Sequence, residues 1–121
     1  MKTREALKQE YKDRPPQVGV LRITNGANGK VLLAGSMNLD GKLNRHRFLL
    51  DAGMHANAAL QEDWKKFGAD SFTFEVLERV QIKDDPGFNL EDALTLLEEI
   101  WIEKVQPFGD RGYNLEGRVR E

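Results

Sequence analysis

The stretch VGVLRITNGANGKVLLAGS, residues 18–36, contains two β-rich runs separated by a turn-forming segment. The first run is VGVLRITN, the second is KVLLAGS, and the dipeptide Asn-Gly occurs in the segment that joins them. Asparagine and glycine tolerate the positive φ angles that tight hairpin turns need. We therefore predict an antiparallel β-hairpin whose loop of about four to five residues leaves the turn type open.

Three helices and one more strand are expected after the hairpin. Leucines recur at helical spacing within residues 38–53, and leucine and aromatic residues do so within residues 57–68. Phenylalanine and valine alternate with polar residues over 71–80, which predicts a strand. A longer helix is expected over 90–105, with Asn89 as its N-cap. This order predicts a small α+β fold with a three-stranded antiparallel sheet flanked by helices.

The N-terminal segment is expected to lie outside this domain. Residues 3–13 have the composition of a short polar helix, and Arg-Pro-Pro at 14–16 ends it, because the residue before a proline avoids the helical conformation. We therefore expect a helical extension over residues 1–16 and one domain over residues 17–121.

The composition excludes several classes of protein. The chain has no cysteine, so neither a disulfide nor a thiolate metal site is available. No apolar run approaches about 18 residues, and the charged N-terminus lacks the hydrophobic core of a secretory signal, so we expect a cytoplasmic protein without a membrane span. The net charge is −2, yet residues 1–47 carry 10 Lys+Arg against 4 Asp+Glu. A mixed surface is the ordinary interpretation, and a basic face that meets phosphate is the alternative.

One acidic residue falls on the apolar side of the helix expected at 90–105. With Leu94 at the origin of a helical wheel, Trp101 and Val105 lie within about 20° and Glu98 lies at about 40°. Burying an unpaired carboxylate is costly, so Glu98 needs a cation, donors from elsewhere in the fold, or water in a cleft. A structural ion pair with Lys42 or an arginine is the alternative.

The helix expected at 38–53 also carries ionisable groups beside its leucines. His46 lies at the margin of the apolar arc, and Lys42 lies one turn before it on the same flank. Histidine can act as a base near neutral pH, and lysine is a cation that can contact phosphate. Structural roles stay open for both, because a helix-face histidine is often a satisfied core residue and a lysine stem can cover apolar surface.

Several segments, taken together, resemble one known family. They are Gly19-Val20-Leu21, Leu32-Leu33-Ala34, Ser36-x-Asn38-Leu39 followed by Lys42 and His46, HANAALQEDWKKFGADSFTFEVLE at 55–78, Glu98-x-x-Trp101-Ile102, and Tyr113-Asn114-Leu115. Over residues 17–115 this pattern resembles the GIY-YIG endonuclease superfamily. The first two segments correspond to the GIY and YIG elements.

The resemblance implies a metal-dependent nuclease site. The family's glutamate, here Glu98, binds a single divalent ion, Mg²⁺ or Mn²⁺, which polarises the scissile phosphate. Lys42 occupies the position of the catalytic arginine, keeping its charge but not its bidentate fork. His46 is expected to serve as a general base. The two signature tyrosines are replaced by Leu21 and Leu32, which can only pack.

The resemblance also implies a nucleic-acid partner, with DNA favoured over RNA, and a protein partner is a possible source of specificity. Asn114 is expected to line the site. Three interpretations are open: a divergent but active nuclease, a module that binds nucleic acid without cleaving it, and a protein-interaction module in which Glu98 is paired structurally. The side chains expected to contact nucleic acid are Lys30, Asn44, Arg45, Arg47, Lys65 and Lys66.

Overall fold

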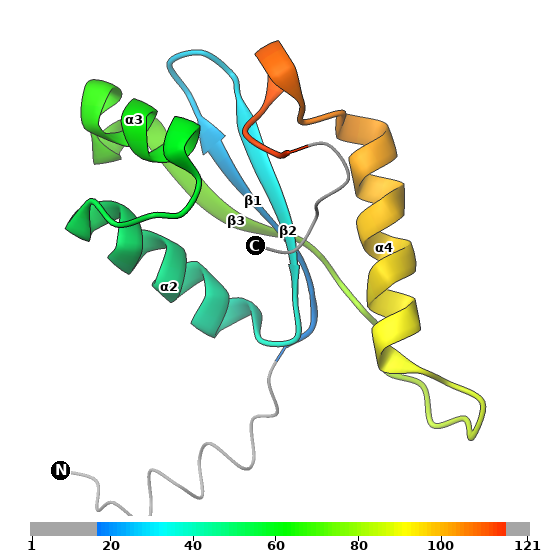
Figure 1. Cartoon of the computed structure of the whole chain (residues 1–121). Helices are drawn as coiled ribbons and strands as arrows, with labels where there is room; N and C mark the ends of the chain where they lie inside the picture. Colours follow the sequence, from blue (N-terminus) through cyan, green and yellow to red (C-terminus); the bar gives the residue numbers. More distant parts are fainter. Residues whose placement is uncertain (1–16, 116–121) are drawn as a thin grey trace, which may run out of the picture.

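The computed structural model describes residues 17–115, and Figure 1 shows them as a small sheet with helices on both sides. The expected helix at residues 3–13 lies outside the described residues. The predicted α+β class, the three-stranded antiparallel sheet and the flanking helices are confirmed. None of the helices described between residues 17 and 115 is long and apolar enough to cross a membrane.

The predicted hairpin forms the first two strands of the sheet. Strand β1 (Gly19–Asn25) pairs antiparallel with β2 (Val31–Ser36), and β3 (Phe72–Arg79) pairs antiparallel with the other side of β1. The strand order is β2-β1-β3, so β1 is central and β2 is an edge strand. At the turn the backbone N–H of Asn25 donates to the carbonyl of Lys30, which closes the hairpin.

Each of the three predicted helices is bounded by a capping residue at its start or its end. Helix α2 (Leu39–Ala52) ends at Gly53, whose φ of 74° is left-handed and therefore suits glycine. Helix α3 (Ala58–Phe67) follows Asn57, and α4 (Leu90–Val105) follows Asn89. Both asparagine side chains accept a hydrogen bond from a backbone N–H of the first helical turn. The structure also has two short 3₁₀ turns, η1 (Ala69–Ser71) and η2 (Gly109–Arg111).

The helices divide between the two faces of the sheet, with α2 and α3 on one face and α4 on the other (Figure 1). Alternate side chains of a strand point to opposite faces, and the main apolar cluster lies on the face covered by α2 and α3. Both leucines at the expected tyrosine positions are in this cluster and are fully buried. Its buried members are Leu21, Ile23, Leu32, Ala34, Leu39, Leu50, Leu60, Trp64, Phe72 and Tyr113.

The outer edge of β2 is partly closed by the segment that follows η2. Gly112 forms a parallel bridge with Val31, and the backbone N–H of Tyr113 donates to the carbonyl of Val31 at 2.9 Å. The side-chain amide of Asn114 then pairs with both backbone groups of Leu33, accepting from its N–H and donating to its carbonyl, each at 2.8 Å. An edge strand with unpaired groups invites association, and this segment satisfies the carbonyl of Val31 and both backbone groups of Leu33.

Candidate functional site

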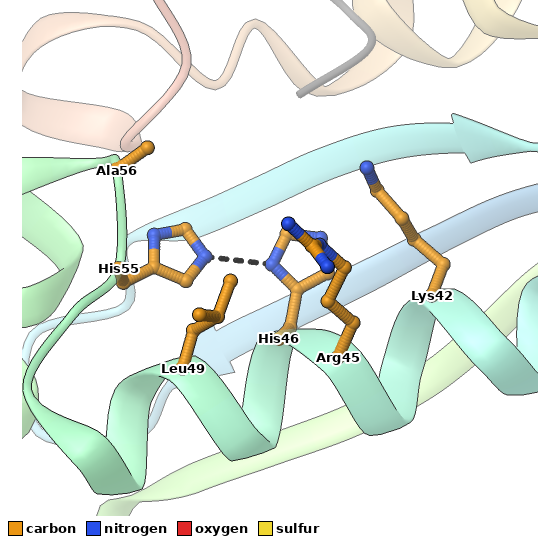
Figure 2. Close-up of a pocket in the computed structure, with 6 residues that line it drawn as sticks. All are labelled: Lys42, Arg45, His46, Leu49, His55 and Ala56. Carbon is orange, nitrogen blue, oxygen red and sulfur yellow. Dashed lines mark hydrogen bonds between the residues drawn. The ribbon is translucent and has the colours of Figure 1, made fainter.

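A basic cavity lies between α2 and the loop that leads to α3. Its volume is about 100 Å³, and Figure 2 shows the side chains of α2 rising toward it, with β2 behind and the loop residues at one end. Helical spacing places the α2 members on one side of the helix, because residues three and four apart are neighbours. The lining contains two cations and two histidines: Lys42, Arg45, His46, Leu49, His55 and Ala56.

The two histidines of the cavity form a direct pair. Nδ1 of His46 lies 2.7 Å from Nε2 of His55, and the two rings stack with their centroids 5.0 Å apart. A hydrogen bond from the backbone N–H of His55 to the buried side chain of Gln61 fixes the position of His55. Gln61 in turn donates to the carbonyl of Leu50, which ties the loop to the end of α2.

The hydrogen-bond partners assign the tautomers of this pair. Nδ1 of His55 accepts from the backbone N–H of Asn57 at 2.9 Å, so the proton of a neutral His55 is on Nε2. That proton is donated to Nδ1 of His46, which leaves the His46 proton on its own Nε2. His46 therefore presents a donor to its surroundings, and neither of its nitrogens can accept a proton from water while the pair is intact. This geometry does not support the general-base role expected of His46.

Burial and neighbouring charges keep both rings neutral. Desolvation, followed by electrostatic interaction with His55, Lys42 and Arg45, lowers the pKa of His46 from 6.5 to about 4. Desolvation and Lys42 also lower the pKa of His55. Protonation of either ring would in addition place two donors face to face. At neutral pH the positive charge of the cavity thus comes from Lys42 and Arg45.

Glu98 lies on the other face of the sheet, where α4 packs against β1 and β2. Leu94 and Glu98 are the buried residues of α4, and Glu98 is 5% exposed. The helical wheel is correct for these two, whereas Trp101 and Val105, which it placed nearest to Leu94, are only half-buried. Its carboxylate is in contact with the backbone of Gly35 in β2, and a Cβ atom built on Gly35 would lie 2.0 Å from Oε1 of Glu98. The missing side chain of Gly35 is what gives the carboxylate room.

Glu98 has few potential metal ligands around it. Residues 17–115 contain no group of three or more histidine, aspartate or glutamate side chains that could hold a metal. Mg²⁺ is commonly held by one or two carboxylates, with water and substrate phosphate as the other ligands. A single carboxylate, here Glu98, is enough for that mode of binding. The described residues do not supply the several side chains that a site built entirely from protein ligands would need.

Strand β2 separates the two parts of the candidate site. Ala34 contributes to the cluster facing α2 and α3, and its neighbour Gly35 faces Glu98 on α4. The cavity lining does not include Glu98. In Figure 1, α2 and α4 lie on either side of β2. A ligand that reached both Glu98 and Lys42 would therefore have to cross the edge of this strand.

Comparison with known proteins adds the family context. No family model and no curated protein matches the sequence of this chain. A solved structure of the catalytic domain of the homing endonuclease I-TevI is 26% identical over 81% of this chain and 97% of its own, with a TM-score of 0.63. A mutant of the catalytic domain of this intron endonuclease is 24% identical over 87% of this chain and 99% of its own, with a TM-score of 0.65. The chain has the GIY-YIG endonuclease fold.

Within the GIY-YIG fold, the residues expected to contact nucleic acid do not all gather at the cavity. Arg45 lines it, but the guanidinium of Arg47 lies over the ring of Phe74, 4.6 Å from its centroid. Lys30 lies over the ring of Tyr113 at the far end of the hairpin. The other three are exposed and do not line the cavity: Asn44 on α2, and Lys65 and Lys66 in the last turn of α3.

Two residues of the candidate site were not expected from the sequence. His55 follows the helix cap and reads as a loop residue, since nothing local indicates that it returns to His46. Gly35 lies beside the YIG-like segment, where Ala34 holds the glycine position, and only the contact with Glu98 reveals its role. Two features of the sequence could have indicated these residues. One is a histidine shortly after a helix that already carries a histidine, and the other is a glycine inside an apolar strand.

Proposed function

We propose that this protein is a metal-dependent hydrolase of phosphodiester bonds in nucleic acid, with a degenerate and slow active site. One observation carries the proposal. In a GIY-YIG fold, a glutamate on the inward side of α4 lies against a bare glycine of β2, and a cavity with two cations lies across the same strand. A structural helix would place an apolar side chain at the position of Glu98.

The roles follow from the chemistry of each side chain. Glu98 would hold a single Mg²⁺ or Mn²⁺ ion, which supplies Lewis-acid polarisation of a phosphate oxygen when bound. Lys42 and Arg45 would attract and orient the backbone phosphate, because fixed cations offset its charge. DNA is the proposed substrate class, and a protein partner is proposed as the source of sequence specificity.

The slow rate follows from the two leucines. Leu21 and Leu32 are 0% exposed inside the apolar cluster, so no hydroxyl is available at the positions of the signature tyrosines. A general base is worth about 10²–10⁴ in rate. With His46 already committed to His55, activation of water would depend on solvent and on the bound ion. We expect turnover far below that of a typical nuclease.

Cleavage of single- and double-stranded DNA and RNA in the presence of Mg²⁺ or Mn²⁺ tests the proposal. Wild-type protein should cleave at least one substrate, and Glu98→Gln should abolish both cleavage and the metal-induced rise in melting temperature, since a ligand stabilises only the state that binds it. Glu99→Gln is the matched control, because Glu99 is exposed on the same helix. Cleavage that survives in Glu98→Gln would exclude the proposed metal ligand.

The buried leucines also favour a second candidate, a module that binds nucleic acid without cleaving it. Both candidates predict binding that weakens steeply with salt, because phosphate contacts release counterions. They differ in whether the nucleic acid is cleaved, since only the hydrolase would produce shorter fragments. Metal-independent, salt-sensitive binding with no cleavage of any substrate would select the second candidate.

A further inference from the structure

Helix α4 has a second apolar side in addition to the one that packs on the sheet. Leu96 is 59% exposed and Ile100 is 40% exposed, and the two lie one turn apart. With about 100° of rotation per residue, the centre of this side lies about 130° from the buried side of Leu94 and Glu98. Single exposed apolar residues are ordinary, but a row at helical spacing is typical of a helix that contacts a second partner. The members of this outer apolar row, spaced i, i+3, i+4 and i+7, are Ala93, Leu96, Leu97 and Ile100.

Carboxylates border the outer apolar row on both flanks. On the flank nearest the sheet, Glu78 of β3 lies beside the helix, because its Oε1 atom accepts from the indole N–H of Trp101 at 3.0 Å. The cation of this region, Lys104, lies over the ring of Trp101. An apolar row with acidic borders is suited to a helix that carries apolar and basic side chains next to one another. The exposed carboxylates of the other flank are Asp92, Glu99 and Glu103.

The N-terminal segment, which lies outside the described residues, has this composition. Residues 1–16 carry five Lys or Arg against three Asp or Glu, which gives a net side-chain charge of +2. On the helix expected over residues 3–13, Leu7 and Tyr11 are one turn apart. An isolated helix of this length is marginal in water, so its formation depends on an apolar surface to pack against. The row next to Leu7 and Tyr11 is basic and consists of Arg4, Lys8 and Lys12.

The connection to the sheet places this segment within reach of α4. The backbone N–H of Val80, the residue after β3, donates to the carbonyl of Val18 just before β1. In Figure 1 the start of α4 lies at this same end of the sheet. Residues 14–16 span about 10 Å when extended, and a helix over residues 3–13 is about 16 Å long. Such a helix can therefore run along the outer apolar row from the start of α4.

We propose that residues 3–13 form a helix that packs antiparallel to α4, with Leu7 and Tyr11 against the outer apolar row. The antiparallel direction follows from the connection, since the end of this helix has to stay near the start of α4. Tyr11 then lies beside Ala93, and Leu7 lies beside Leu97. The handedness of the two helices turns the basic row toward the sheet, on the flank of Glu78.

The tether lets a weak contact suffice. A segment joined to its binding surface by a short linker has an effective concentration in the millimolar range, so the helix needs little intrinsic affinity for α4. Among the α-helices described between residues 17 and 115, α4 alone covers its face of the sheet, so no other described helix competes for the outer apolar row. The contact and its test do not depend on nuclease activity.

Paramagnetic relaxation enhancement in the full-length chain tests the contact. The chain has no cysteine, so a single nitroxide label can be placed at Glu5→Cys or at Asp13→Cys, both outside the proposed contact. The label at position 5 should broaden the backbone amide signals around Ile100 most, and the label at position 13 should broaden those around Ala93 most. Broadening in the reverse order, or none on α4, would overturn the proposal.

A matched pair of variants separates docking from mere proximity. Leu7→Asp in the labelled chains should abolish the broadening on α4, because it places a charge in the apolar contact. Gln9→Asp lies on the opposite side of the same helix and should preserve the broadening. The ¹H–¹⁵N spectrum of residues 17–115 reports whether the domain stays folded in both. Broadening that survives in Leu7→Asp would count against docking through this residue and would overturn the proposal.

Mixed samples identify the occupant of the outer apolar row. When labelled chain at natural isotope abundance is mixed with unlabelled ¹⁵N chain, broadening appears only if the segment reaches a second copy. Broadening within one chain and none in the mixture supports the proposal. Broadening in the mixture of the same size as within one chain would assign the surface to a second copy and overturn the proposal.

Thermal stability gives an independent check of the contact. Leu7→Ser and Leu96→Ser should each lower the melting temperature, and the double variant should lose less than the sum of the two, because both changes remove one shared contact. Leu7→Ser and Phe48→Ser should instead be additive, since Phe48 is exposed on α2 across the sheet. Additive losses for Leu7→Ser and Leu96→Ser would contradict the docking.

Discussion

Glycine at position 35 allows the carboxylate of Glu98 to approach the backbone of a β-strand closely. A Cβ atom added there would lie 2.0 Å from Oε1, 2.4 Å from Cδ and 2.7 Å from Cγ of Glu98, so the glutamate side chain as a whole would have to move. A backbone that must remain close to a functional group is one of the few positions where glycine is required inside a strand.

The substitution Gly35→Ala should therefore act through Glu98. We expect a loss of stability of about 1–3 kcal/mol, the usual cost of overpacking, together with loss of the metal-induced rise in melting temperature. Chemical denaturation and thermal scans with and without Mn²⁺ measure the two effects. Gly87→Ala, in an open loop where the nearest atom is 3.6 Å from the added Cβ, should change neither. An unchanged metal response in Gly35→Ala would separate the ion from Glu98.

The histidine pair should make stability depend on pH. The pKa of His46 is lowered to about 4 from 6.5, so between these values the unfolded chain binds more protons than the folded one. Stability is then fully retained above pH 6.5, falls progressively as the pH drops toward 4, and the loss attributable to His46 is at most about 3 kcal/mol. Urea denaturation across this range should show the decline, and His46→Gln should flatten it. A wild-type stability independent of pH over this range would contradict the buried neutral ring.

At the scale of elements, the segments that surround β2 define the boundaries of the candidate site. Helix α2 covers one face of the strand, α4 covers the other, and residues 112–114 lie along its free edge. The amide of Asn114 replaces a neighbouring strand at Leu33, since it satisfies one backbone donor and one acceptor together. Asn57 joins this segment to the histidine pair through the carbonyl of Tyr113. The edge segment and the cavity are thus parts of one connected hydrogen-bond network.

Removal of the Asn114 amide should loosen this element locally. Asn114→Ala leaves two buried backbone groups of Leu33 without their partner, which should cost about 1–3 kcal/mol. Amide hydrogen exchange should show faster exchange at Leu33 and Tyr113, with α4 less affected. Leu115→Ala is a suitable comparison because Leu115 is 57% exposed and should change exchange little. Unchanged protection at Leu33 in Asn114→Ala would show that the strand edge is satisfied in another way.

At the scale of the whole molecule, charge is distributed unevenly between the two sides of the sheet. Helix α2 carries Lys42, Arg45 and Arg47 against the exposed Asp40 and Asp51, whereas α4 exposes four carboxylates against Lys104. A polyanion is attracted to the first side and repelled by the second, so nucleic acid should approach from α2 toward the edge of β2. The exposed acidic residues of α4 are Glu91, Asp92, Glu99 and Glu103.

This polarity predicts a measurable salt dependence. The logarithm of the DNA-binding constant should fall linearly with the logarithm of salt concentration, and Lys42→Gln should reduce the slope by about one unit, as expected for one lost phosphate contact. Lys83→Gln should leave the slope unchanged. Fluorescence anisotropy at several salt concentrations gives both slopes. Equal slopes for wild type and Lys42→Gln would remove Lys42 from the interface.

The sequence by itself determined the elements of this protein and the inward direction of Glu98. Hairpin turns, helix caps and apolar periodicity depend on residues close together in the chain, and the hairpin, the three helices and the cap at Asn89 formed as predicted. The family resemblance also indicated the fold correctly.

Only the tertiary structure decided what surrounds those residues. Gly35 and Glu98 are far apart in sequence, and their contact follows from the packing of α4 on the sheet. The role of His46 depends on His55 and on one backbone N–H of Asn57, and the direction of a proton in such a pair depends on every partner at once. Local pattern sets which way a side chain faces, whereas long-range packing sets what it meets there.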